Sequence, residues 1–156
     1  MTILAFDLSL SCTGYSVFSN DGMFIETGHI ETNGKDSTPR RLKVIAQRLR
    51  KLKTKYKPSK VLIERGFYRF AGSTEQIFRV NGITNLIFCE IEQIELHATS
   101  IRKIVAGRGN MKKEELRDYI LQKYPSIEFA NMDEIDSFAL GLAYFLKEGV
   151  LNGRES

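Results

Sequence analysis

The first eighteen residues contain two apolar runs separated by a short polar stretch, and the first run ends in a single acid. Residues 3–6 are apolar and are followed by Asp7, and a second apolar run occupies residues 14–18. This pattern predicts a buried strand over residues 2–8 and an antiparallel partner over residues 14–19. A carboxylate at the end of a central strand is costly unless it is paired or holds a cation. Asp7 is therefore either an acceptor for turn N–H groups or a metal ligand.

Two further apolar runs adjoin acids, which favours the metal interpretation. Residues 61–63 precede Glu64, and Asp133 and Asp136 precede the apolar residues 138–140. Two acids three positions apart on a helix share one face, although first-turn acids also simply complement the helix dipole. Four such carboxylates suit hard divalent cations such as Mg²⁺ or Mn²⁺. Two cations about 4 Å apart could clamp a phosphate, one activating water and the other stabilising the leaving 3′ oxygen.

The length and composition indicate an ordinary globular protein. The 156 residues are 42% hydrophobic and 27% charged, which we interpret as one domain over residues 1–150 followed by a flexible tail at 151–156. No apolar run approaches the roughly 18 residues of a transmembrane helix, and no secretory signal is recognisable. Cys12 and Cys89 form no metal-binding pattern with each other or with a histidine. We therefore expect free thiols, a cytoplasmic location, no membrane association and no small-molecule cofactor.

Positive charge is concentrated in one segment. The net charge is +4, and from Ser37 to Ile63 there are ten lysines and arginines but no acid. A basic block beside a carboxylate cluster suits a phosphate-bearing ligand, because carboxylates alone repel phosphate. The alternative is a solvated basic helix face.

The remaining periodicities predict a mixed α/β sheet. Strands are expected at residues 23–30, 59–64 and 91–98, with Asn20-Asp21-Gly22 as a hairpin turn. Helices are expected from Pro39 to about Tyr56, from Ser73 or Thr74 to about Glu90, from Thr99 or Ser100 to before Gly107, from Asn110 to about Tyr124, and from Asn131 to before Gly149. The order of elements predicts five strands with helices on both faces, the first and fourth strands being parallel neighbours. Asp7 and Glu64 would then lie side by side.

Two helices carry informative apolar patterns. In the last helix we expect an apolar face through Ile135, Phe138 and Leu142, with Asp133 and Asp136 on a different face. The helix after Ser73 has more apolar surface than one stripe requires, which predicts a homodimer interface formed by Ile77, Val80, Ile83, Leu86 and Ile87. The alternative is that both faces of this helix are covered within one subunit.

Several classes of protein fit the sequence less well. No Ser/His/Asp or Cys/His constellation is present, and the absence of a G-x-x-x-x-G-K-[ST] motif excludes a P-loop ATPase. A sugar-kinase or actin-like ATPase would need glycine-rich phosphate loops, where this chain has Ser9 and Ser11, and two such domains. A non-catalytic DNA-structure binder and an RNase H-like nuclease acting on RNA or RNA/DNA hybrids remain alternatives, since basic residues alone do not separate DNA from RNA.

An ordered set of motifs resembles that of the RuvC-type Holliday junction resolvases of the RNase H-like superfamily. The chain is short, and in this it is similar to the phage-borne members of the family. The matching motifs are Asp7 with Thr13-Gly14-Tyr15, Ile63-Glu64, Gly107-x-Gly109 with Lys113, and Asp133-x-x-Asp136-Ser137-x-Ala139. The resemblance implies an RNase H-like fold and a homodimer that cuts branched DNA by paired nicks, with two Mg²⁺ per active site and Mn²⁺ as a substitute. It also implies that Asp7, Glu64, Asp133 and Asp136 are the catalytic, metal-binding acids. A partner helicase is left open.

The same resemblance suggests DNA-binding residues. Phe67 matches an aromatic position used at the unstacked junction centre, Lys113 a basic residue near the cleaved strand, and Arg102 or Lys103 another. Phe67 lies in an aromatic, basic loop between Gly66 and Gly72, where exposed rings could stack on unpaired bases. The full expected DNA-binding set is Phe67, Tyr68, Arg69, Phe70, Arg102, Lys103, Arg108, Lys112 and Lys113. The chain departs from the family at Leu8-Ser9, where a Pro-Gly pair is usual, and at Ala98, where a proline is frequent.

Overall fold

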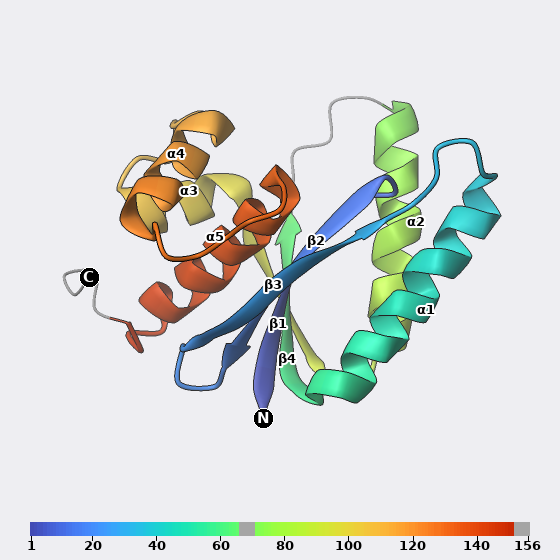
Figure 1. Cartoon of the computed structure of the whole chain (residues 1–156), viewed down its shortest axis with the longest axis horizontal. Helices are drawn as coiled ribbons and strands as arrows, with labels where there is room; N and C mark the ends of the chain where they lie inside the picture. The colour runs from blue at the N-terminus through green and yellow to red at the C-terminus, as the bar shows by residue number, and fades with distance from the viewer. Residues whose placement is uncertain (66–70, 152–156) are drawn as a thin grey trace.

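One mixed sheet runs through the computed structural model, which describes residues 1–65 and 71–151. Within that part of the chain the sheet has five strands in the order β3-β2-β1-β4-β5 (Figure 1). The strands are β1 (Thr2–Asp7), β2 (Cys12–Ser19), β3 (Phe24–Glu31), β4 (Pro58–Arg65) and β5 (Glu92–His97). The helices are α1 (Thr38–Tyr56), α2 (Ala71–Ile87), α3 (Ala98–Ala106), α4 (Lys113–Lys123) and α5 (Met132–Lys147). The predicted fold class and order of elements are confirmed.

The central strand pair lies as expected. β1 pairs antiparallel with β2 and parallel with β4, with Phe6 opposite Ile63 in the parallel register. Asp7 and Glu64 each follow that pair by one residue, so the two carboxylates leave the sheet at the same edge. The prediction that they lie on neighbouring strands is confirmed.

Helices cover both faces of the sheet. Figure 1 shows α1 and α2 on one side and α3, α4 and α5 on the other. Because side chains alternate along a strand, β1 contributes Leu4 and Phe6 to the core under α1 and α2, and Ile3 and Ala5 to the core under α3–α5. The same alternation turns Asp7 toward the α3–α5 layer.

Helix α5 lies close against β2 because two glycines leave room for it. A Cβ on Gly14 would collide with the backbone of Asp133, and a Cβ on Gly141 would collide with the ring of Phe18. The helix is buried continuously from Glu134 to Phe145, covered by strands on one side and by α3 and α4 on the other. Ile135, Phe138 and Leu142 lie in the core as expected, and Asp133 and Asp136 approach Asp7 from a different face of the helix. That acidic face is itself covered at Asp136, which is 4% exposed.

The helix starts differ in part from those predicted. Asn131 caps α5 as expected, its side chain accepting the N–H of Glu134 at 3.0 Å. Helix α3 is capped at His97 instead of Thr99 or Ser100, and α4 at Lys112 instead of Asn110; neither cap residue's side chain caps its helix. The N–H of Lys112 instead donates to the Glu115 carboxylate at 2.7 Å. The start of α4 is therefore capped by Glu115 from within the helix.

The apolar residues of α2 do not all lie on one outer surface. Val80 and Ile87 are 0% and 8% exposed and pack in the core beneath α1 and α2, so the prediction that they form a dimer interface is wrong. Ile83 packs against the same core, and Ile77 is half-buried. Leu86 is 70% exposed. Phe78, which was not in the predicted set, is also exposed on α2, at 56%.

The end of the domain also differs from the prediction. Leu151, expected in the flexible tail, packs against the core of the α3–α5 layer, and its N–H donates to the Phe145 carbonyl at 3.3 Å. The rest of that tail, residues 152–156, lies outside the described residues. Among the helices of residues 1–65 and 71–151, none has the length and apolar character needed to cross a membrane.

Candidate active site

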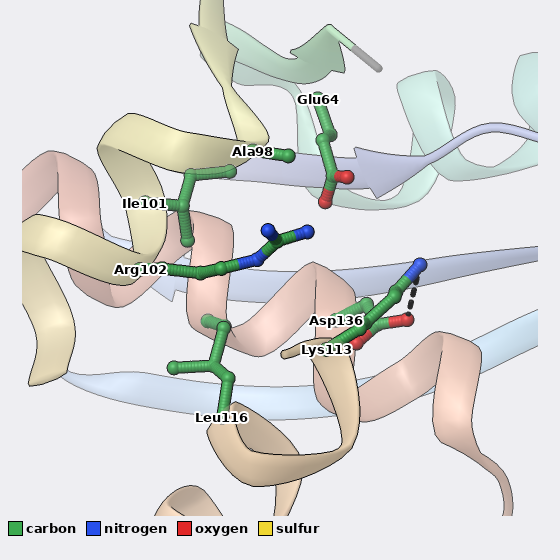
Figure 2. A pocket seen from close by; sticks show the side chains of 8 residues that line it. Glu64, Ala98, Ile101, Arg102, Lys113, Leu116 and Asp136 are labelled. Atoms are coloured by element: carbon green, nitrogen blue, oxygen red, sulfur yellow. Dashed lines mark ion pairs between the residues drawn. The ribbon is translucent and has the colours of Figure 1, made fainter. Parts of the chain in front are cut away.

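Three of the four predicted acids converge at the end of the central strand pair. Carboxylate oxygens of Asp7, from β1, and of Asp133 and Asp136, from the N-terminal part of α5, all lie within 4.8 Å of one another. Glu64, from the end of β4, lines a pocket together with Asp136 (Figure 2). Oxygen ligands at this spacing fit a hard divalent cation such as Mg²⁺ or Mn²⁺, and the donor set lacks the nitrogen or sulfur that zinc prefers.

Backbone packing places the acids. Gly14 is the β2 partner of Asp7, and the missing side chain at Gly14 lets the carbonyl of Asp133 approach β2 directly. The Asn131 cap fixes the first turn of α5 at that point. The strand pairing and one glycine therefore bring residues 7 and 133 together, although they are far apart in sequence.

Asp136 is held by two cations from α4. Arg117 donates to both carboxylate oxygens, Nε to Oδ1 at 3.0 Å and Nη2 to Oδ2 at 2.7 Å. The Nζ of Lys113 lies 2.8 Å from the same Oδ2 and 3.8 Å from an oxygen of Asp7. Only 3% of the Asp136 side chain is exposed, so these ion pairs compensate a buried charge.

The strand-end carboxylates have raised pKa values. Burial raises the pKa of Asp7 well above its ordinary range; Lys113 opposes this, and the charges of Glu64, Asp136 and Asp133 add to it. Burial also raises the pKa of Glu64, with Lys113 lowering it and Asp136 raising it. Crowded, poorly solvated carboxylates of this kind favour the binding of a cation, which relieves both causes of the shift.

Basic side chains complete the pocket. Figure 2 shows Arg102, from α3, and Lys113, from the start of α4, pointing into the space between Glu64 and Asp136. The cavity volume is ≈ 10 Å³, about the room of one water molecule. The charges of Arg102 and Arg117 also lower the pKa of Glu64. This mixture of acids and cations can hold a metal and a phosphate in one place.

Of the other expected DNA-binding residues, three can be described. Lys103, Arg108 and Lys112 are exposed on α3 and on the segment that joins it to α4. None of these three lines the pocket, whereas Arg102 and Lys113 do. The aromatic and basic loop residues Phe67, Tyr68, Arg69 and Phe70 lie outside the described residues, and their role remains a prediction.

Two features of the site were missed in the sequence. Arg117 belongs to the centre of the site, and its spacing of four residues from Lys113 was the available signal, since both then lie on one helix face. Glu134, between the two acids of α5, is buried and accepts from His29 Nδ1 at 2.7 Å and from the N–H of Ala130 at 3.0 Å. Glu134 therefore fixes the start of α5 against β3, and its sequence neighbourhood gave no sign of this partner.

Comparison with known proteins agrees with this geometry. The profile of the family described as crossover junction endodeoxyribonuclease RuvC matches residues 3–143. A protein of that name from Chloroherpeton thalassium is 29% identical, the match covering 99% of this chain and 87% of the relative.

Solved structures share the fold. Thermus thermophilus RuvC in complex with a Holliday junction substrate superposes with a TM-score of 0.80 at 16% identity, covering 95% of this chain and 94% of that one. The fowlpox virus resolvase, solved with Holliday junction DNA, gives 0.61 at 19% identity, covering 97% and 100%. At these identities the likeness establishes the RNase H-like fold.

Proposed function

The chain belongs to the RuvC family of crossover junction endodeoxyribonucleases, and from this premise we propose that it cuts branched DNA, four-way junctions above all, by metal-dependent hydrolysis of phosphodiester bonds. The observation that carries the proposal is the convergence of Asp7, Asp133 and Asp136 within 4.8 Å, with Glu64 on the neighbouring strand. We propose these four acids as the catalytic set and as the ligands of two Mg²⁺ ions, for which Mn²⁺ would substitute.

The residues divide the work by position. Asp7 and Glu64, at the ends of adjacent strands, and Asp133 and Asp136, on α5, would hold the metal on a rigid frame. When bound, the divalent cations supply an activated water and stabilise charge on the scissile phosphate and the leaving oxygen. Arg102 and Lys113 line the pocket from another side and would attract the phosphate, offsetting the repulsion from the carboxylates.

We infer that branched DNA is the substrate from the family and from the charge distribution. The Thermus thermophilus relative was solved with a Holliday junction as its substrate, and the fowlpox virus resolvase with Holliday junction DNA. On this chain, Lys103, Arg108 and Lys112 are exposed on α3 and on the segment that joins it to α4, and would add positive charge for a DNA backbone. Phe67 and its neighbours, in the segment that follows Arg65, would stack on bases at the branch point.

We further propose that two subunits act together so that both cuts fall in one junction. Of the predicted set, Leu86, 70% exposed on α2, and half-buried Ile77 and Ile83 remain available for the contact. An isologous contact would repeat the same patch on both subunits. Two active sites would then face two strands of one branched molecule.

The test is a cleavage assay on synthetic DNA. Purified protein is incubated with a four-way junction, a three-way junction and a linear duplex of the same sequence, with Mg²⁺ or with EDTA. Paired nicks in the four-way junction, dependent on Mg²⁺, are expected, with little cutting of the duplex. Equal cutting of junction and duplex, or cutting in EDTA, would contradict the proposal.

A further inference from the structure

The guanidinium of Arg117 forms hydrogen bonds with both carboxylate oxygens of Asp136. It donates to Oδ1 through Nε at 3.0 Å and to Oδ2 through Nη2 at 2.7 Å, a fork that matches both carboxylate oxygens. The two side chains are 16% and 3% exposed, so water competes little for either partner. A metal ion bound by Asp136 would have to share or replace one of these hydrogen bonds.

Neighbouring charges increase this competition. Lys113 also binds Oδ2 of Asp136, and Arg102 lines the same small pocket beside Glu64. The site thus contains three positively charged side chains, those of Arg117, Lys113 and Arg102, and four carboxylates. Its formal charge is therefore near −1, which a bound cation would neutralise. The cavity between these side chains has a volume of only ≈ 10 Å³. The cluster is already largely neutralised by its own chain.

We propose that Arg117 is a tethered counter-ion that competes with a divalent cation for Asp136, so that the protein alone binds the cation weakly and DNA promotes its binding. DNA would do so because its phosphates offer the guanidinium of Arg117 another bidentate partner. By linkage, the cation then strengthens DNA binding by the same factor. The inference rests on the proposed function, since it assumes that the acids bind a divalent cation.

Arg117 is the residue to test because its contacts separate it from the other cations. Lys113 touches both Asp7 and Asp136, so its removal would disturb two acids at once. Arg117 pairs with Asp136 alone among the four acids, and its remaining contact is Nη1 to the sulfur of Met132 at 3.2 Å. Lys123 lies on the same helix, near the rings of Tyr119 and Tyr124, and is the matched control.

The experiment measures Mn²⁺ binding to the free protein by electron paramagnetic resonance, without DNA and without turnover. Arg117→Gln should lower the Mn²⁺ dissociation constant by about tenfold, because a charge-assisted competing pair is lost. The Mn²⁺ dissociation constant of Arg117→Lys should lie between those of Arg117→Gln and the wild type. The constant of Lys123→Gln should equal that of the wild type. An unchanged or weaker affinity in folded Arg117→Gln would overturn the inference, since Arg117 would then only position Asp136.

A second readout covers DNA and folding. Adding an uncleavable four-way junction should tighten Mn²⁺ binding in the wild type and tighten it less in Arg117→Gln. Equal tightening in both proteins would also overturn the inference. If Arg117→Gln is unfolded by circular dichroism, Arg117→Lys alone decides: Mn²⁺ affinity no higher than the wild type counts against competition. Absence of Mn²⁺ binding in every protein, with and without DNA, would instead contradict the proposed function.

Discussion

The two helix layers of this molecule carry charge in different ways. At the acidic site of the α3–α5 layer, charge is buried and paired: Asp136 is 3% exposed and held by Arg117 and Lys113. In the α1–α2 layer, charge is exposed, with Arg40, Lys43 and others on the outer face of α1. Buried, oriented charges act strongly and at one point, whereas exposed charges act weakly, collectively and in a salt-dependent manner. The buried, paired charges can therefore act on a single phosphate, whereas the exposed charges of α1 can supply only a salt-dependent attraction.

The largest effect is expected when one carboxylate of the site is replaced by its amide, which should separate DNA cutting from DNA binding. Asp7→Asn or Glu64→Gln should reduce junction cutting by about a thousandfold or more, since several kcal/mol of metal-derived stabilisation would be lost. Junction binding, measured by fluorescence anisotropy in EDTA, should stay the same or tighten, because a repulsive charge is removed. Full activity in either variant would place the active site elsewhere.

A change on α2 should alter assembly and leave the acidic cluster intact. Leu86→Glu should raise the dimer dissociation constant by about tenfold or more, as expected for an apolar anchor. Leu121→Glu, on α4 and also exposed, is the control. Sedimentation velocity across a concentration series measures both variants. A wild type that is monomeric at micromolar concentration and still makes paired cuts would rule out the dimer.

The exposed charge of α1 should matter most at the end nearest the acids. Since β1 and β4 are parallel and α1 connects back to β4, α1 begins at the sheet edge that carries Asp7. The double change Arg40→Gln with Lys43→Gln should lower the slope of log affinity against log salt by about 2, since each phosphate contact contributes about 0.9. Arg50→Gln with Lys51→Gln, farther along the helix, should change the slope less; equal slopes for both pairs would mean that α1 is only a solvated surface.

The smallest expected effect is on the free energy of unfolding, which replacement of Asp7 should raise and replacement of Asp136 should lower. The raised pKa of Asp7 means that the folded protein holds this proton more tightly than the unfolded chain does. Its stabilising contribution is present below the ordinary pKa and is lost as pH rises through the raised pKa. In EDTA at pH 7, Asp7→Asn should therefore raise unfolding free energy by about 0.5–2 kcal/mol, or Tm by about 2–4 °C per kcal/mol.

Asp136→Asn should act in the opposite direction because it leaves Arg117 without its partner. Thermal melts of both variants at pH 5 and pH 8 measure the difference. A Tm gain for Asp7→Asn that is larger at pH 8 than at pH 5 is expected. A gain that is independent of pH would mean that the buried charge of Asp7 is not its cause.

Strand periodicity and strand ends were readable from the sequence. The alternation of Leu4 and Phe6 with Ile3 and Ala5 fixes which way Asp7 points. Helix α1 returns the chain from β3 to β4, which pairs parallel with β1. These local rules depend only on backbone geometry, which is why the parallel pairing of β1 with β4 and the neighbouring positions of Asp7 and Glu64 were predicted correctly.

Features that depend on packing between distant segments were not readable. Gly14 admits the backbone of Asp133 only because α5 crosses β2 there, and this crossing also buries Asp136. An arginine within a helix, such as Arg117, has no local signature of a buried partner. Val80 and Ile87 were assigned to an interface because periodicity shows that a residue is apolar, but not which surface covers it.

The most direct measurement is a sulfur substitution at the cut phosphate of a four-way junction. Single-turnover rates are compared in Mg²⁺ and Mn²⁺, with oxygen or sulfur at each non-bridging position. If the four carboxylates hold a hard cation on that phosphate, sulfur at one position should slow cutting by about tenfold or more in Mg²⁺, and the softer Mn²⁺ should restore the rate. A sulfur effect of equal size in both ions, or none in either, would contradict a metal-centred active site.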